Sequence, residues 1–76
     1  MPAITRLNTC KVTMYAADHL PPHFHIIAND GREALVEIAT LEVVAGEVSK
    51  AAMKEVNNWL ATTTIDLSAK WKELNP

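Results

Sequence analysis

Hydrophobic and polar residues alternate from Thr9 to Ala16. One side of this segment carries Cys10, Val12, Met14 and Ala16, and the other carries Thr9, Lys11, Thr13 and Tyr15. A period of two is typical of a β-strand with one buried face. We therefore expect a strand from Thr9 to Ala16, and a shorter strand from Ile4 to Leu7 joined to it through Asn8. Pro21 and Pro22 follow in a loop, because proline has no N–H to donate to a strand pair.

Two further alternating segments, His23–Ala28 and Arg32 to about Ile38, flank the turn residues Asn29-Asp30-Gly31 and predict a β-hairpin. The loop length sets the register, because directly opposed residues of an antiparallel pair project from the same face. A two-residue Asp30-Gly31 turn would place His25 opposite Val36 and His23 opposite Ile38. That register would bury both imidazoles in the apolar face.

A three-residue Asn29-Asp30-Gly31 loop gives a different register. With Gly31 in the left-handed conformation, it pairs His23 with Glu37 and His25 with Leu35. Both strands then become amphipathic in the same sense. We prefer this register, which places His23, His25 and Glu37 on the sheet face away from the main core.

The second half of the chain has helical periodicity. Leu41 to Ala45 is expected to form a further short strand or edge that ends at Gly46. A helix then begins at the N-cap Ser49 and continues to the Thr62-Thr63-Thr64 run, with an apolar stripe made of Ala52, Val56, Trp59 and Leu60. A second helix begins near Asp66 and carries Leu67, Trp71 and Leu74. We expect both tryptophans to pack the helices onto the sheet.

These elements predict an α+β fold: a small, mainly antiparallel β-meander of three to five strands, followed by two C-terminal helices packed on one sheet face. No repeat and no Gly/Ser linker divides the 76 residues, so residues 1–76 are expected to form a single domain. The one cysteine, Cys10, allows no internal disulfide and is expected to be a buried core residue. Because so small a core gives marginal stability, we expect a protein partner or a homo-oligomer.

Charge and hydropathy narrow the range of partners. Seven Lys and Arg residues against nine Asp and Glu residues give a net charge of −2, which argues against DNA binding through phosphate neutralisation. RNA contact through a local basic face stays open, with Lys50 and Lys54 as the best candidates. No stretch approaches the roughly 18 apolar residues that a membrane span needs, and the start lacks the pattern of a signal peptide. We expect a soluble, cytoplasmic protein without membrane contact.

All three histidines fall within the seven residues from His19 to His25. On a strand, His23 and His25 project to the same side about 6.5 to 7 Å apart, so their imidazoles can share one metal ion. His19 could return from the loop as a third ligand, with Asp18 or Glu37 as a fourth ligand or as the acceptor that holds a ring tautomer. These residues predict a divalent metal such as zinc, and three histidine ligands alone would leave one coordination position open.

Two other interpretations use the same residues. Without metal, one histidine could act as general base and another as general acid, as cleavage of a phosphodiester or an RNA strand requires. His23 beside Glu37 would then be the better base. Alternatively, the histidines only cap a strand end and hydrogen-bond loop carbonyls near the prolines. The sequence contains no nucleophile elbow, no glycine-rich phosphate loop and no metalloprotease His-Glu-x-x-His motif.

The string Asp18-His19-Leu20-Pro21-Pro22-His23-Phe24-His25-Ile26, followed by Ala34-Leu35-Val36-Glu37-Ile38 and a helix from Lys50 to Trp59, resembles a known family. It is similar to the small bacterial proteins grouped as domain of unknown function 4160. The resemblance covers nearly the whole chain, and the histidines match position by position, with Asp18 as the acidic residue before the first of them. It implies no established activity.

The resemblance does imply a partner. Members of the family are often encoded beside a small protein of the kind called domain of unknown function 2442, which has suggested toxin and antitoxin pairs. We therefore expect an interaction module that presents a histidine-rich sheet face. The alternative is a small histidine- or metal-dependent hydrolase or nuclease that uses His19, His23 and His25, so the sequence leaves open whether the chain is an enzyme.

Overall fold

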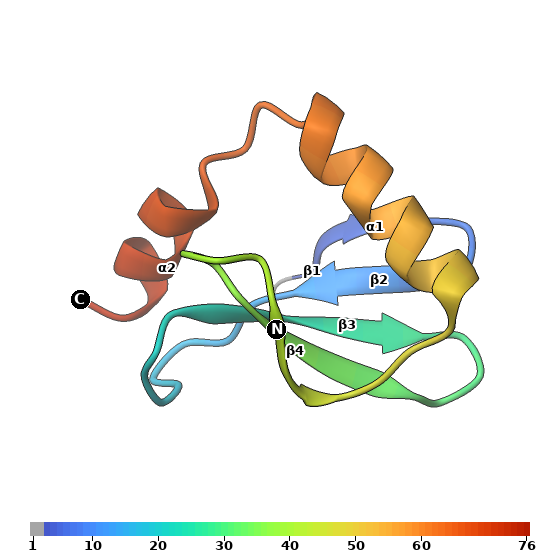
Figure 1. Ribbon diagram of the computed structural model, residues 1–76. Helices are drawn as coiled ribbons and strands as arrows, with labels where there is room; N and C mark the ends of the chain where they lie inside the picture. The colour runs from blue at the N-terminus through green and yellow to red at the C-terminus, as the bar shows by residue number, and fades with distance from the viewer. Residues whose placement is uncertain (1–2) are drawn as a thin grey trace.

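Five strands and two helices make up the computed structural model, which describes residues 3–76 (Figure 1). Their bounds are β1 Ala3–Arg6, β2 Cys10–Thr13, β3 His23–Ala28, β4 Glu33–Glu37, β5 Val43–Gly46, α1 Lys50–Thr62 and α2 Leu67–Leu74. Each strand pairs antiparallel with the next, so the sheet is a meander in the order β1-β2-β3-β4-β5. Both helices follow the sheet, and this confirms the predicted α+β fold.

The hairpin between β3 and β4 has the register that we preferred. His23 lies opposite Glu37, and His25 lies opposite Leu35. Gly31 has a φ of 92° and donates its N–H to the carbonyl oxygen of Ala28 at 3.0 Å, which closes the three-residue loop. A side chain at Gly31 would strain this left-handed backbone. The two-residue alternative is therefore wrong.

The second strand is shorter than its hydrophobic pattern. We expected a strand from Thr9 to Ala16, but β2 ends at Thr13 and the backbone then turns through Ala17, which has a positive φ of 56°. Met14 stays fully buried although it lies outside the strand. The apolar pattern therefore predicted the burial of Met14 correctly, although the strand pairing ends one residue earlier. The chain leaves the sheet before it reaches Asp18.

The helices begin where the capping residues predict. The Ser49 hydroxyl accepts a hydrogen bond from the N–H of Ala52 at 3.1 Å, and the Asp66 carboxylate accepts one from the N–H of Ala69 at 3.1 Å. These two caps fix where α1 and α2 begin.

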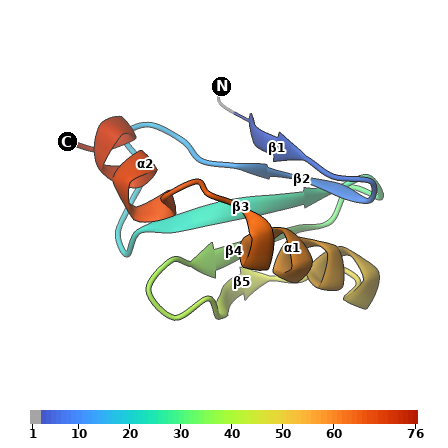
Figure 2. The ribbon, with the colours of Figure 1, turned by 90° about the horizontal axis from the view of Figure 1, so that it is seen from above.

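Both helices lie on the same face of the sheet, as Figures 1 and 2 show. The core between the layers consists of Cys10, Val12, Met14, Phe24, Ile26, Ala28, Val36, Ala52, Val56, Leu67 and Trp71. Among the described residues no helix is long and apolar enough to cross a membrane.

Cys10 is a core residue, as predicted, with an exposed fraction of 2%. Burial raises the pKa of its thiol. The hydrogen bond with Thr9 lowers this pKa and the charge of the neighbouring Glu55 carboxylate raises it, so that the net effect is a raised pKa. A raised pKa leaves little thiolate at neutral pH, so this cysteine is a poor nucleophile.

Candidate metal centre

Three side chains from two parts of the chain converge at the start of β3. Asp18, His23 and His25 each offer one ligand atom, and these atoms all lie within 4.8 Å of one another. The Oδ2 atom of Asp18 is 3.0 Å from Nε2 of His23 and 3.1 Å from Nε2 of His25. The two imidazole centroids are 5.1 Å apart. One carboxylate oxygen therefore faces two imidazole nitrogens at the same time.

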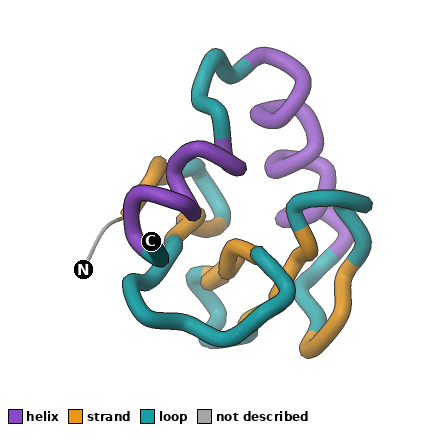
Figure 3. The backbone as a smooth tube through the Cα atoms, turned by 90° about the vertical axis from the view of Figure 1, so that its left-hand side faces the viewer, coloured by secondary structure: helices purple, strands orange, loops and turns teal. Residues whose placement is uncertain are grey.

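The strand and the loop each have a clear role in this convergence. Because side chains two residues apart on a strand share a face, β3 presents His23 and His25 together. The loop that carries Asp18 is held by the C-cap residue of α2, since the backbone N–H of Asp18 donates to Oδ1 of Asn75 at 2.8 Å. Asn75 in turn donates from Nδ2 to the carbonyl oxygen of Tyr15 at 3.2 Å. Figure 3 shows this loop beside the C-terminal end of α2.

Burial differs sharply across the cluster. The His23 side chain is 1% exposed, whereas those of His25 and Asp18 are 12% and 16% exposed. We expected His23 on an open sheet face, but its ring lies against Trp71 of α2, with the two ring centroids 5.3 Å apart. The short helix therefore covers one histidine and leaves the other accessible to solvent.

The hydrogen bonds of His23 define its tautomer. Nδ1 lies 2.7 Å from the carbonyl oxygen of Pro21, which can only accept, so Nδ1 carries the proton. In a neutral ring, Nε2 then presents a lone pair toward Asp18. Although these two atoms are only 3.0 Å apart, their geometry is not that of a hydrogen bond, and Nε2 is buried without a partner. Buried polar atoms without partners are rare in folded proteins.

His25 has a carboxylate on each side of its ring. Nδ1 is 2.6 Å from Oε2 of Glu33, and Nε2 is 3.1 Å from Oδ2 of Asp18. A carboxylate on Nδ1 fixes the tautomer that leaves Nε2 free to bind a metal, as in many zinc sites. The sequence analysis missed Glu33. The hairpin register contained the signal, because Ile27 pairs with Glu33 and this pairing puts Glu33 diagonally across from His25 on the same face.

Two predicted site residues lie outside the cluster. His19 is 71% exposed, and its Nδ1 contacts the other carboxylate oxygen of Asp18 at 2.9 Å. Glu37 is directly opposite His23 in the sheet, yet its carboxylate accepts a hydrogen bond from the hydroxyl of Thr40 at 3.3 Å. The carboxylate beside His23 is that of Asp18, which takes the place that we had given to His19 in the ligand set.

Asp18 is ionised at neutral pH. Burial acts to raise its pKa, but hydrogen bonding with His25, the hydrogen bond from the backbone N–H of His19 and the positive charge of His23 and His19 whenever these rings are protonated together lower the pKa to about 2. The centre therefore contains one full negative charge beside two titratable imidazoles.

Comparison with known protein families identifies the family of this chain. The model of a family described as Domain of unknown function (DUF4160) matches residues 10–72. The chain belongs to the DUF4160 family. The match runs from β2 into α2 and confirms that the chain resembles this family. No curated protein and no solved structure matches this DUF4160 chain.

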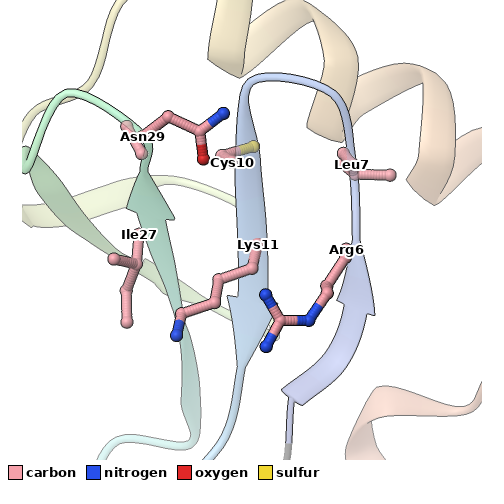
Figure 4. A pocket seen from close by; sticks show the side chains of 7 residues that line it. Arg6, Leu7, Cys10, Lys11, Ile27 and Asn29 are labelled. Carbon is pink, nitrogen blue, oxygen red and sulfur yellow. The ribbon is translucent and has the colours of Figure 1, made fainter.

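The surface of the DUF4160 chain, over residues 3–76, includes a cavity beside the cluster and another on the sheet. One, of about 500 Å³, borders Asp18 and Trp71. The other, of about 260 Å³, lies at β1, β2 and β3 between Arg6, Lys11 and Asn29 (Figure 4). No histidine lines either cavity, but Asp18 lines the first, which therefore lies next to the candidate metal centre.

Proposed function

We propose that this domain binds one divalent transition-metal ion through Nε2 of His23, Nε2 of His25 and Oδ2 of Asp18. The observation that carries the proposal is the buried, unpartnered Nε2 of His23 facing the Asp18 carboxylate. A lone pair beside an anionic oxygen is unfavourable in a buried setting unless a cation or a proton lies there. Zinc or iron(II) suits two imidazoles and one carboxylate.

The spacing fits a metal with little rearrangement. Ligand atoms around a tetrahedral zinc are about 3.4 Å apart, since each bond is about 2.0 to 2.1 Å long. The two nitrogen-to-oxygen separations are 3.0 and 3.1 Å. The Nδ1 atoms of both ligand rings already have acceptors in Pro21 and Glu33, as metal-bound histidines usually do.

Three protein ligands leave a coordination position for water. Catalytic zinc sites share this feature, and the metal lowers the pKa of the bound water to about 7. His25 and Asp18 are both partly exposed, so solvent and a small ligand can reach the centre. The reaction class that we propose is therefore metal-dependent hydrolysis.

Calorimetric titration of the tag-free protein with zinc and nickel at pH 7.5 tests the proposal. We expect one ion per chain, with binding abolished in His23→Gln and retained in His19→Gln. The second variant is a matched control because His19 touches the same carboxylate from the solvent side. Saturable binding that survives His23→Gln, or no binding by the wild type, would overturn the ligand set. Hydrolysis of p-nitrophenyl acetate should then require both the ion and His23.

A second candidate is the interaction module, as one half of a toxin and antitoxin pair. Strand β5 favours it, because β5 is an edge strand that is exposed along its whole length, with Val43 43% and Val44 51% exposed. Exposed apolar edges are common sites of strand addition by a partner. The flanking Glu42 and Glu47 suit a partner strand with basic residues. Binding of a co-expressed protein of the domain of unknown function 2442 kind should be weakened by Val44→Lys and unchanged by His25→Gln.

A further inference from the structure

The larger of these two cavities lies next to the candidate metal centre, because Asp18 belongs to both. It has a volume of about 500 Å³ and is lined mainly by apolar side chains: Ala16, Ala17, Leu20, Trp71 and Leu74. This volume lies in the range of about 300 to 1,000 Å³ that small-molecule sites occupy. Asp18 also borders it, and Trp71 contacts the cavity as well as the ring of His23. A ligand in the cavity would therefore lie beside the metal-binding residues.

An exposed apolar side chain, that of Leu20, lines the same cavity. It is 74% exposed, the highest fraction among the large exposed hydrophobic residues, and it lies in the loop between Asp18 and β3 at the edge of this cavity. Exposing a large apolar side chain to water is unfavourable relative to burying it. An apolar group in the cavity would cover Leu20 and remove this penalty.

The charges around the cavity select the kind of ligand. No lysine, arginine or histidine side chain lines it, and its one charged side chain is that of Asp18. Its polar residue Asn75 is engaged by the N–H of Asp18 and the carbonyl of Tyr15. Beyond a phosphate bound to the metal, a phosphodiester chain would find no cationic side chain in the cavity to neutralise its further charges. A neutral apolar group has no such conflict.

We infer that this cavity holds the small apolar body, acyl or aryl, of a ligand whose oxygen-donor head group binds the metal. The inference rests on the proposed metal centre and names the substrate class of that centre as small apolar carbonyl compounds. The apolar body contacts Trp71, Leu74 and Leu20, and the head group takes the position that the three protein ligands leave open.

Hydroxamates of two sizes test the inference, because both have the same metal-binding head. Zinc-loaded protein is titrated with acetohydroxamate and with benzohydroxamate. We expect benzohydroxamate to bind at least about tenfold more tightly, since even one extra methylene changes affinity in an apolar pocket by about 10-fold or more. Its binding should also shift the indole N–H signal of Trp71 in an NMR spectrum more than that of Trp59, the second tryptophan of the chain.

Variants separate the cavity from the metal. Leu20→Ser should reduce the preference for benzohydroxamate by about threefold or more, while zinc affinity is retained. Leu41→Ser is the matched control, because Leu41 is also exposed, at 50%, but lies outside the cavity. Equal affinities of the two hydroxamates, or a preference that Leu20→Ser and Leu41→Ser change equally, would overturn the inference and leave the metal centre standing. Failure of zinc itself to bind would overturn both.

Discussion

Nε2 of His23 and Oδ2 of Asp18 lie 3.0 Å apart without a hydrogen bond between them. The proton on the ring is committed to the carbonyl oxygen of Pro21, so the ring cannot donate to the carboxylate unless it becomes charged. A divalent ion resolves this arrangement, and so does an imidazolium. A metal site differs from an imidazolium because only the metal site binds zinc with an affinity that falls when a ligand is removed.

Asp18→Asn should weaken zinc binding by more than about 100-fold. An amide oxygen carries no charge, and changes even outside the ligand shell cost about 10- to 100-fold in affinity. Competition with a chromogenic chelator measures the constant. If Asp18→Asn binds zinc as tightly as the wild type, the carboxylate does not ligate the metal and the convergence of the three residues has only a structural role.

Glu33→Gln should weaken zinc binding by about 10- to 100-fold, since it removes the charge that holds Nδ1 of His25. Glu37→Gln is the matched control. Glu37 sits on the same strand and directly opposite His23, but its carboxylate contacts Thr40 instead of a ring. Calorimetry should therefore give wild-type affinity for Glu37→Gln. A larger loss at Glu37 than at Glu33 would restore our sequence-based choice of carboxylate.

Glu33 and Glu37 show which features of the candidate site could be predicted from the sequence and which could not. Alternation placed His23 and His25 on one face, and Gly31 selected the loop length, because both depend on the local backbone. Which carboxylate reaches which ring depends instead on side-chain reach across the hairpin, so Glu37 was preferred and Glu33 was missed. The register alone ranks directly opposite residues above diagonal ones.

The burial of His23 needed tertiary information. It results from Trp71 of α2, which is separated from β3 by most of the chain, and from the turn at Ala17 that brings Asp18 back over the strand. Periodicity identified Trp71 as a packing residue but could not say what it would pack against. Asp18 was accordingly expected only as a fourth ligand, because its position depends on a loop without periodicity.

Asn75→Ala should loosen the loop that carries Asp18. The variant removes the acceptor of the Asp18 N–H and the donor to the Tyr15 carbonyl, both part-buried. Leaving such groups unpaired costs about 1 to 3 kcal/mol, and urea unfolding should show a loss in this range. Zinc affinity should fall as well. Asn57→Ala provides the comparison, because Asn57 is exposed on α1; an equal loss in both variants would mean that Asn75 does not position the loop.

Glu55 gives a prediction about pH that is independent of the metal. Its carboxylate accepts hydrogen bonds from the backbone N–H and the hydroxyl of Thr9 at 2.8 and 2.7 Å, which tie α1 to the β1–β2 turn. The hydrogen bonds from Thr9 and from the N–H of Asn8 lower the pKa of Glu55. Burial acts to raise it, but the net result is a pKa below the ordinary value of 4.5. Because the unfolded chain holds this proton more tightly, the stabilisation is present above about pH 4.5 and is lost as the pH falls through the lower folded-state pKa.

Glu55→Gln should therefore be less stable than the wild type at pH 7, and should lose less stability between pH 7 and pH 3. Urea midpoints at both pH values measure this, with the exposed Glu47→Gln as control. Equal acid sensitivity of Glu55→Gln and the wild type would show that the contact between Glu55 and the turn does not stabilise the fold.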